Sequence, residues 1–450
     1  MNTKKIHMLI LVLLLCLGLC GCDTFDNFRK AFFDKDEDDT PVIKIGVFEP
    51  LNGSYAEAAS REIEGIKLAN SMYGAVLNSR IELVYADNQS DANQGRVAAS
   101  TLIDEGVSVV IGSYSSVLSL AAEDIFSQNK MPTIMATCTN PIITQTSDYH
   151  FRVCYIDSYE GTGAAAYLID ELKIPSAAIL VAEGHDYDIS KADAFEKAFA
   201  EALPRFVPKE EELPEEPVPE KTDKKSTKDS KKKNEPVEPV ADPEEPVEPA
   251  RTVPEHGTEK FTFNDKDTNW DTLFASIYDA GYDVIYMPSD VQAAQQIIDT
   301  ARNQGYDFLW IGTNQWEGIT TENAVYTAEY GHGAELSTMT QAFLKAYDQL
   351  HPGQTPTDEV ALGFDAYMLI RDAVSRAGTD ANSFQYLTAL SQVKEMNGAT
   401  GSITMSTGGD PIKDIIVEQY KDGDFSPVYT IKGLETTRIL EEENNNEQAE

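Results

Sequence analysis

The chain has 450 residues, of which 42% are hydrophobic, so it is long enough for two or three ordinary domains or for one large two-lobed protein. Lys and Arg total 36 against 75 Asp and Glu, which gives a formal net charge of -39. A surface of this charge repels nucleic acid and anionic lipid headgroups, so we expect no nucleic-acid partner.

The first residues have the pattern of an export signal. Two lysines precede a continuous apolar run over residues 8–19, which is too short for a membrane-spanning helix of roughly 20 residues. The run ends in Leu-Cys-Gly-Cys at residues 19–22 and resembles the bacterial lipobox. This resemblance implies a lipoprotein signal peptide over residues 1–21, cleavage before Cys22 and a diacylglycerol on the Cys22 thiol. An ordinary signal peptide or a short anchor is the alternative interpretation.

Three segments have compositions that predict no stable structure of their own. Residues 22–41 are polar and acidic and are expected to form a flexible tether, and residues 436–450 an acidic tail. Residues 207–259 are dominated by Pro, Glu, Lys, Asp, Ser and Thr, with repeated Glu-Pro-Val triplets. Because large apolar residues are nearly absent there, burial cannot offset the entropy of ordering. We expect a disordered or polyproline-like insertion, with a docking arm as the functional alternative.

Apolar strand patterns alternate with helical patterns along the rest of the chain. Most of the strands are apolar throughout, which is typical of parallel sheets covered on both faces. The pattern predicts an α/β fold with two doubly wound, Rossmann-like lobes and a crevice at the carboxyl ends of their strands. The main expected strands are 41–47, 81–85, 107–112, 132–136, 177–182, 283–287 and 308–312, and further strands are expected at 401–405, 415–420 and 427–431.

Cysteine and catalytic motifs are sparse outside the first segment. Cys138 and Cys154 could form one disulfide, but two buried unpaired residues are the favoured interpretation. No Cys/His cluster with metal-ligand spacing, nucleophile elbow or phosphate-binding P-loop occurs in the sequence. We therefore expect no metal, no cofactor and no enzymatic activity.

Six short motifs in order carry a resemblance to a known family. From about Ile43 to Lys432 the chain resembles the branched-chain amino-acid (Leu/Ile/Val) binding proteins of the type I periplasmic-binding fold. The resemblance implies two lobes joined by a three-strand hinge, with crossings near Asp157, Ala328 and Asn397. It assigns 42–157 plus 329–397 to one lobe and 158–328 plus 398–435 to the other. The motifs lie at residues 45–53, 111–116, 137–141, 310–317, 364–367 and 398–403.

The family's binding residues map onto two loops of the first lobe. Ser116 follows a strand and opens a helix, so its hydroxyl and the helix dipole suit a ligand carboxylate, although it could simply cap that helix. Thr137 and Thr139 map to the groups that hold the ligand's ammonium and carboxylate. Thr139 could equally hold the turn at Asn140. In the second lobe Tyr187 maps to an aromatic that closes over the ligand, or merely covers the core.

Two positions depart from the family pattern. The acidic residue that pairs with the ligand ammonium is Asn314 here, and Glu317 or Asp290 could replace its charge. The aromatic of the first loop corresponds to about Ala58, with Tyr55 nearest. These departures leave open whether the ligand carries a free α-amine.

The resemblance implies a solute-binding lipoprotein of an ABC-type importer. It would be a monomer, lipid-anchored on the extracytoplasmic face of the bacterial cell membrane, and would pass an amino acid or a related small polar ligand to permease subunits. A ligand-sensing receptor module without transport and a binder of amides or short peptides are the alternatives.

Overall fold

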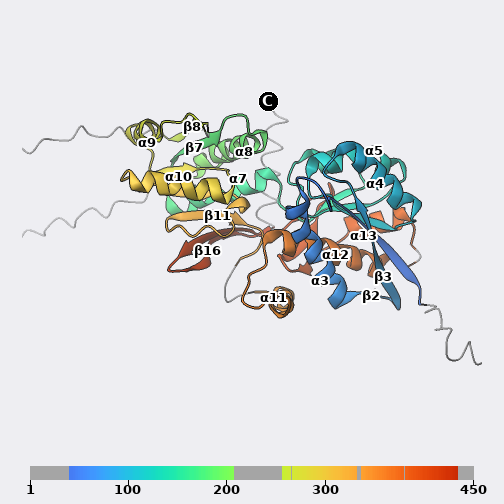
Figure 1. Ribbon diagram of the computed structural model, residues 1–450. Coiled ribbons are helices and arrows are strands. Elements are labelled where there is room, and N and C mark those ends of the chain that lie inside the picture. Colours follow the sequence, from blue (N-terminus) through green and yellow to red (C-terminus); the bar gives the residue numbers. More distant parts are fainter. Residues whose placement is uncertain (1–39, 207–255, 265, 332–335, 380, 434–450) are drawn as a thin grey trace, which may run out of the picture.

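The computed structural model of the chain has two lobes, each built around a sheet with helices on both faces (Figure 1). It describes residues 40–206, 256–264, 266–331, 336–379 and 381–433. The expected signal peptide, Cys22, the tail and nearly all of the tether and of the 207–259 insertion lie outside these residues. Within the described ranges, none of the helices combines the length and apolar character that a membrane span requires.

The first lobe contains a six-stranded sheet in the order β2-β3-β1-β4-β5-β6, in which only β2 is antiparallel. β1 is apolar on both faces because Ile43, Ile45 and Val47 pack under α3 and α12, whereas Phe48 packs under α4 and α5. The strands are β1 (Val42–Glu49), β2 (Ala75–Val76), β3 (Ser79–Asp87), β4 (Val109–Ile111), β5 (Thr133–Met135) and β6 (His150–Arg152). The helices are α3 (Ala56–Tyr73), α4 (Ala92–Asp104), α5 (Ser116–Gln128), α6 (Ile142–Gln145), α11 (Thr338–Leu350), α12 (Asp358–Ala377) and α13 (Ser383–Ser391).

The second lobe contains a seven-stranded sheet in the order β16-β15-β11-β10-β9-β7-β8, in which β15 and β16 are antiparallel. Helices α9 and α10 cover one face and α7 and α8 the other. The strands are β7 (Ser176–Ala182), β8 (Gly257–Phe263), β9 (Val284–Tyr286), β10 (Leu309–Gly312), β11 (Ala324–Ala328), β15 (Ile415–Lys421) and β16 (Asp424–Ile431). The helices are α7 (Asp157–Ala166), which continues as a π-helical turn (Tyr167–Leu172), α8 (Asp186–Ala202), α9 (Trp270–Asp279) and α10 (Val291–Asn303).

The parallel strands of both mixed sheets have the same doubly wound order, so the predicted fold class is confirmed. In each lobe the first strand lies between the second and the third, β1 between β3 and β4 and β7 between β8 and β9. Such a switch in strand order opens a crevice at the carboxyl ends of the strands.

The predicted boundaries of two segments are wrong. β12 (Met396–Gly398), β13 (Gly401–Met405) and β14 (Pro411–Ile412) form a small sheet whose Ile403 and Met405 belong to the core of the first lobe. Asp365 of α12 accepts the backbone N–H of Thr400 at 2.9 Å and ties this sheet to that lobe. The third crossing therefore follows β14 and is not near Asn397. The insertion also ends earlier than residue 259, because β8 begins at Gly257 and pairs with β7.

A buried ion pair joins the three crossings. Glu329, just after β11, accepts the backbone N–H of Tyr155 at 2.8 Å. Its other oxygen lies 2.8 Å from the ammonium of Lys413, which follows β14. Both charged side chains are at most 1% exposed. Because these residues belong to different crossings, the network links all three segments between the lobes.

Candidate ligand-binding site

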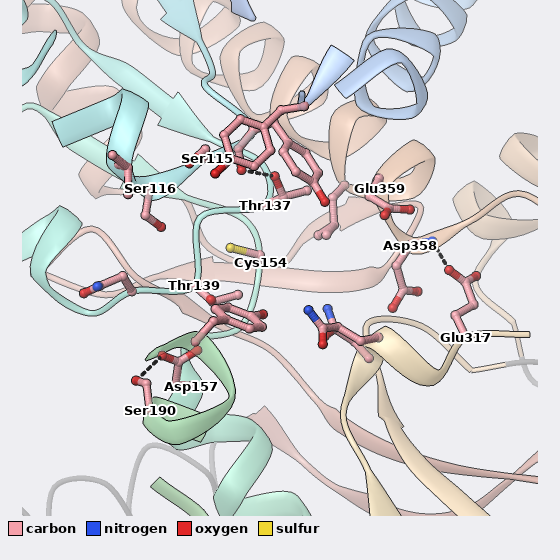
Figure 2. A pocket seen from close by; sticks show the side chains of 18 residues that line it. Ser115, Ser116, Thr137, Thr139, Cys154, Asp157, Ser190, Glu317, Asp358 and Glu359 are labelled. Carbon is pink, nitrogen blue, oxygen red and sulfur yellow. Dashed lines mark hydrogen bonds between the residues drawn. The ribbon is translucent and has the colours of Figure 1, made fainter. Parts of the chain in front are cut away.

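A cavity of about 560 Å³ lies between the two lobes at the carboxyl ends of their strands. Figure 2 shows that loops from both lobes surround it. This volume is within the usual range for sites of small organic ligands. Of the residues predicted to bind ligand, five line it: Ser116, Thr137, Thr139, Tyr187 and Asn314.

The loop after β4 presents the N-terminus of α5 to the cavity. Ser115 is the N-cap residue, with extended backbone, but its side chain makes no capping hydrogen bond in the described structure. Ser116 is the first residue of α5, and both serines line the cavity. The alternative that Ser116 caps the helix is therefore wrong, because Ser115 occupies the cap position. The helix N-terminus, with its partial positive charge, faces the cavity and suits an anion.

The loop after β5 contributes Thr137 and Thr139. The Thr137 hydroxyl donates to Glu62 Oε2 at 2.8 Å, so this side chain is held by α3. Glu62 lies beside the equally buried Glu49, which accepts the backbone N–H of Tyr114 at 2.8 Å. Burial raises the pKa of Glu62 to about 7 and raises that of Glu49 well above its usual value, in the latter case with help from the Glu62 charge.

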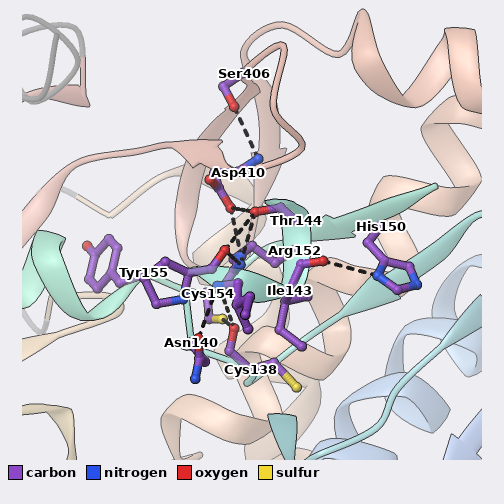
Figure 3. Close-up of polar contacts among 12 residues, drawn as sticks. Cys138, Asn140, Ile143, Thr144, His150, Arg152, Cys154, Tyr155, Ser406 and Asp410 are labelled. Atoms are coloured by element: carbon purple, nitrogen blue, oxygen red, sulfur yellow. Dashed lines mark hydrogen bonds and ion pairs between the residues drawn. The ribbon is translucent and has the colours of Figure 1, made fainter. Parts of the chain in front are cut away.

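Arg152 contacts the loop that contains Cys138 and Asn140 (Figure 3). Its guanidinium is fully buried and donates to the carbonyl of Cys138 at 2.6 Å and to the hydroxyl of Thr144 at 3.1 Å. Asp410, between β13 and β14, neutralises it at 2.7 Å. The small sheet that was predicted to belong to the second lobe thus stabilises a loop of the site in the first.

Cys138 and Cys154 are both buried and free, as favoured from the sequence. Burial raises the pKa of Cys138 to about 11 and that of Cys154 well above its usual value. Both thiols therefore stay protonated at neutral pH, and Cys154 contributes a small weakly polar surface to the cavity.

The second lobe contributes residues from α7, α8 and the loop after β10. Tyr187 is 42% exposed and lies close enough to Thr139 of the first lobe for their side chains to interact. The Asn314 backbone N–H donates to Glu160 at 3.2 Å, whereas its side-chain oxygen is buried without a hydrogen-bond partner in the described structure. That oxygen is an acceptor available to a ligand donor.

Asp290 does not replace the missing family charge. It lies outside the cavity, at the N-cap of α10, where its carboxylate accepts the backbone N–H groups of Gln292 and Ala293 at 2.9 and 3.0 Å. An Asp that follows a strand can cap the next helix or bind a ligand, so the sequence did not distinguish these two roles for Asp290. Tyr55 lines the cavity as the nearest aromatic of the first loop, whereas Ala58 does not.

Three acidic residues that the sequence did not connect with the site also line the cavity. Asp358 and Glu359 open α12, and Asp157 opens α7. Acidic residues in a first helical turn are normally explained by the helix dipole, so their sequence position did not indicate that they line a cavity. Glu317, considered only as a substitute for Asn314, lies beside them and accepts the backbone N–H of Asp358 at 2.9 Å.

The family model described as "Periplasmic binding protein" matches residues 42–216 and 252–424. The chain belongs to this family. Proteins of the family are non-enzymatic binders, in agreement with the prediction that the chain is not an enzyme. One relative, Leu/Ile/Val-binding protein homolog 3 of Brucella melitensis, is 21% identical over 82% of this chain and 88% of its own length. Homolog 2 of Brucella abortus is 32% identical, but the match covers 36% of this chain and only 43% of that relative.

Solved structures of periplasmic binding proteins share the two-lobed fold. A leucine-binding protein of Thermotoga maritima has a TM-score of 0.65 and 23% identity, covering 87% of this chain and 99% of its own. A branched-chain amino-acid binding protein of Streptococcus pneumoniae, in complex with isoleucine, has a TM-score of 0.63 and 21% identity over 87% of this chain and 99% of its own. A Rhodopseudomonas palustris protein in complex with benzoate has a TM-score of 0.63 and 17% identity, covering 86% of this chain and 96% of its own. Similar folds thus hold chemically different ligands.

Proposed function

We propose that this chain is the extracytoplasmic solute-binding lipoprotein of an ABC-type importer, which captures an amino acid or a related small polar ligand and delivers it to a membrane permease. Family membership supports solute binding, and relatives named Leu/Ile/Val-binding proteins support an amino compound as ligand. The observation that carries the proposal is the cavity between the lobes. The loop with Ser115 and Ser116 and the loop with Thr137 and Thr139 both line it.

The proposed recognition begins at the first lobe. The ligand carboxylate binds the N-terminus of α5 at Ser116 together with Thr139, while Thr137 and Asn314 accept hydrogen bonds from its amine. Tyr187 then covers the ligand from the second lobe. Binding shifts the population toward the closed form by the difference in affinity between the two forms, and the three crossings absorb the rotation.

The substitution Ser116→Ala tests this assignment. We expect the affinity for the bound ligand to fall roughly tenfold to a hundredfold, because a hydrogen bond to a charged group contributes about 1.5–3 kcal/mol. The ligand would first be found by thermal shift with L-amino acids, amides, short peptides and benzoate, then measured by calorimetry.

Ser100→Ala, on the exposed face of α4, is the control and should leave both affinity and melting temperature unchanged. Unchanged affinity in Ser116→Ala would refute the role of Ser116. If only benzoate-like acids bound, the amino-acid ligand would be excluded.

A further inference from the structure

The cavity between the lobes has an excess of negative charge. Four carboxylates line it, from Asp157, Glu317, Asp358 and Glu359, and its lining within the described residues includes no Lys or Arg. Figure 2 shows Asp358, Glu359 and Glu317 together on one side, across from Ser115 and Ser116. An anion such as benzoate would leave this side of the cavity uncompensated.

Asp157 and Glu359 each have a basic partner outside the cavity. Asp157 lies 3.2 Å from the ammonium of Lys191, and Glu359 lies 3.2 Å from the guanidinium of Arg61. Each of these two carboxylates therefore already has a cation beside it, although Lys191 also pairs with Glu160. They contribute to the negative electrostatic potential of the cavity, but they do not require a charged ligand as partner.

Asp358 differs from both, because it is only 5% exposed and has no ion-pair partner among the described residues. One of its oxygens accepts the backbone N–H of Glu329 at 3.3 Å. Burial, followed by the charges of Glu317 and Glu329, raises the pKa of Asp358 well above its usual value. A buried carboxylate without a basic partner is unfavourable, and a cation from the ligand would remove the penalty.

The aromatic lining favours the same kind of group. Tyr55 and Tyr114 line the cavity with ring centroids 6.2 Å apart. Aromatic faces attract ammonium and guanidinium groups. The aliphatic members of the lining among the described residues are Val117 and Leu362, so aromatic rings provide much of its apolar surface.

We propose that the ligand carries a second positive charge on its side chain, and that this ammonium or guanidinium group binds Asp358 beside Glu317. The ligand class is then a basic amino acid, whose carboxylate binds at Ser116. This inference rests on the proposed function, because it assumes an amino-acid ligand in this cavity.

The decisive comparison uses ligands of matched size on the wild-type protein. Lysine and norleucine differ only in the terminal ammonium, and arginine and citrulline only in the guanidinium charge. We expect calorimetry to give a dissociation constant for lysine at least roughly tenfold lower than for norleucine, and the same order for arginine against citrulline.

Asp358→Asn keeps the size of the side chain and removes its charge, so it should abolish the preference for lysine over norleucine. Asp290→Asn is the matched control, because it makes the same chemical change at a helix cap outside the cavity, where Asn serves equally well. Should Asp358→Asn fail to fold, as judged by its melting curve, Glu317→Gln is the second variant and should reduce the preference.

Equal affinity of the wild type for lysine and norleucine would overturn the inference and leave the proposed function standing. An equal loss of affinity for lysine and norleucine in Asp358→Asn would also overturn the inference, because Asp358 would then bind the α-ammonium. Failure of every amino acid to bind would overturn both the inference and the proposed function.

Discussion

At the scale of single residues, the paired carboxyl groups of Glu49 and Glu62 support the wall of the site. Glu62 accepts the Thr137 hydroxyl and Glu49 accepts the Tyr114 backbone N–H, so the pair positions two residues that line the cavity. Two adjacent buried carboxyl groups cannot both ionise without penalty. The protonated form of the pair is therefore the one that the fold stabilises.

This pair makes stability depend on pH. The pKa of Glu62 is about 7 in the folded protein, raised mainly by burial, against 4.5 ordinarily. Its contribution to stability is therefore fully present below about pH 4.5 and is lost as the pH rises through 7. Glu62→Gln cannot ionise at this position. Its free energy of unfolding should therefore fall by about 1–3 kcal/mol less than that of the wild type between pH 5 and pH 8.

Urea unfolding at both pH values measures this difference. Glu57→Gln, an exposed position on the same helix, serves as control and should follow the wild-type pH trend. A Glu62→Gln variant with the wild-type pH dependence would show that this carboxyl group is not responsible.

At the scale of elements, the close crossing of α3 and α12 sets the position of the acidic residues in the site. A Cβ atom at Gly65 of α3 would lie 1.9 Å from the carbonyl oxygen of Val360, and one at Gly363 of α12 would lie 2.1 Å from that of Glu62. Both positions exclude any side chain while the helices keep this distance. Because α12 begins with Asp358 and Glu359, this contact determines where these carboxylates meet the cavity.

Gly65→Ala should therefore force the two helices apart. We expect a loss of about 1–3 kcal/mol in the free energy of unfolding, because overpacking requires a backbone shift. Urea or thermal unfolding measures it. Gly95→Ala on α4 is the control, since a Cβ there would meet its nearest atom, in Phe48, at 3.5 Å, an ordinary contact, and should be neutral or stabilising.

At the scale of the whole molecule, the three crossings and the Glu329–Lys413 ion pair connect two lobes that each have their own cores. The membrane anchor proposed at Cys22 lies outside the described residues and is tested separately. We expect Cys22→Ser to prevent lipid labelling and to release the protein from the membrane fraction, because position 22 then has no thiol to take the diacylglycerol.

Metabolic labelling with a fatty-acid probe, followed by fractionation of cells, measures this. Cys20→Ser is the matched control and should keep the label and the membrane association. Labelling retained in Cys22→Ser but lost in Cys20→Ser would move the lipid site to Cys20.

The sequence alone determined the fold class and the order of most strands and helices, and it predicted five residues that line the cavity, because local apolar patterns and loop motifs carry that information. Only the tertiary structure decided which acidic groups share the cavity. Asp157 and Asp358 are some 200 positions apart in the chain and are brought to one cavity by the crossings and the contact of α3 with α12. Asp290 and Asp358 both stand at helix starts, and only packing makes one a cap and the other part of the site.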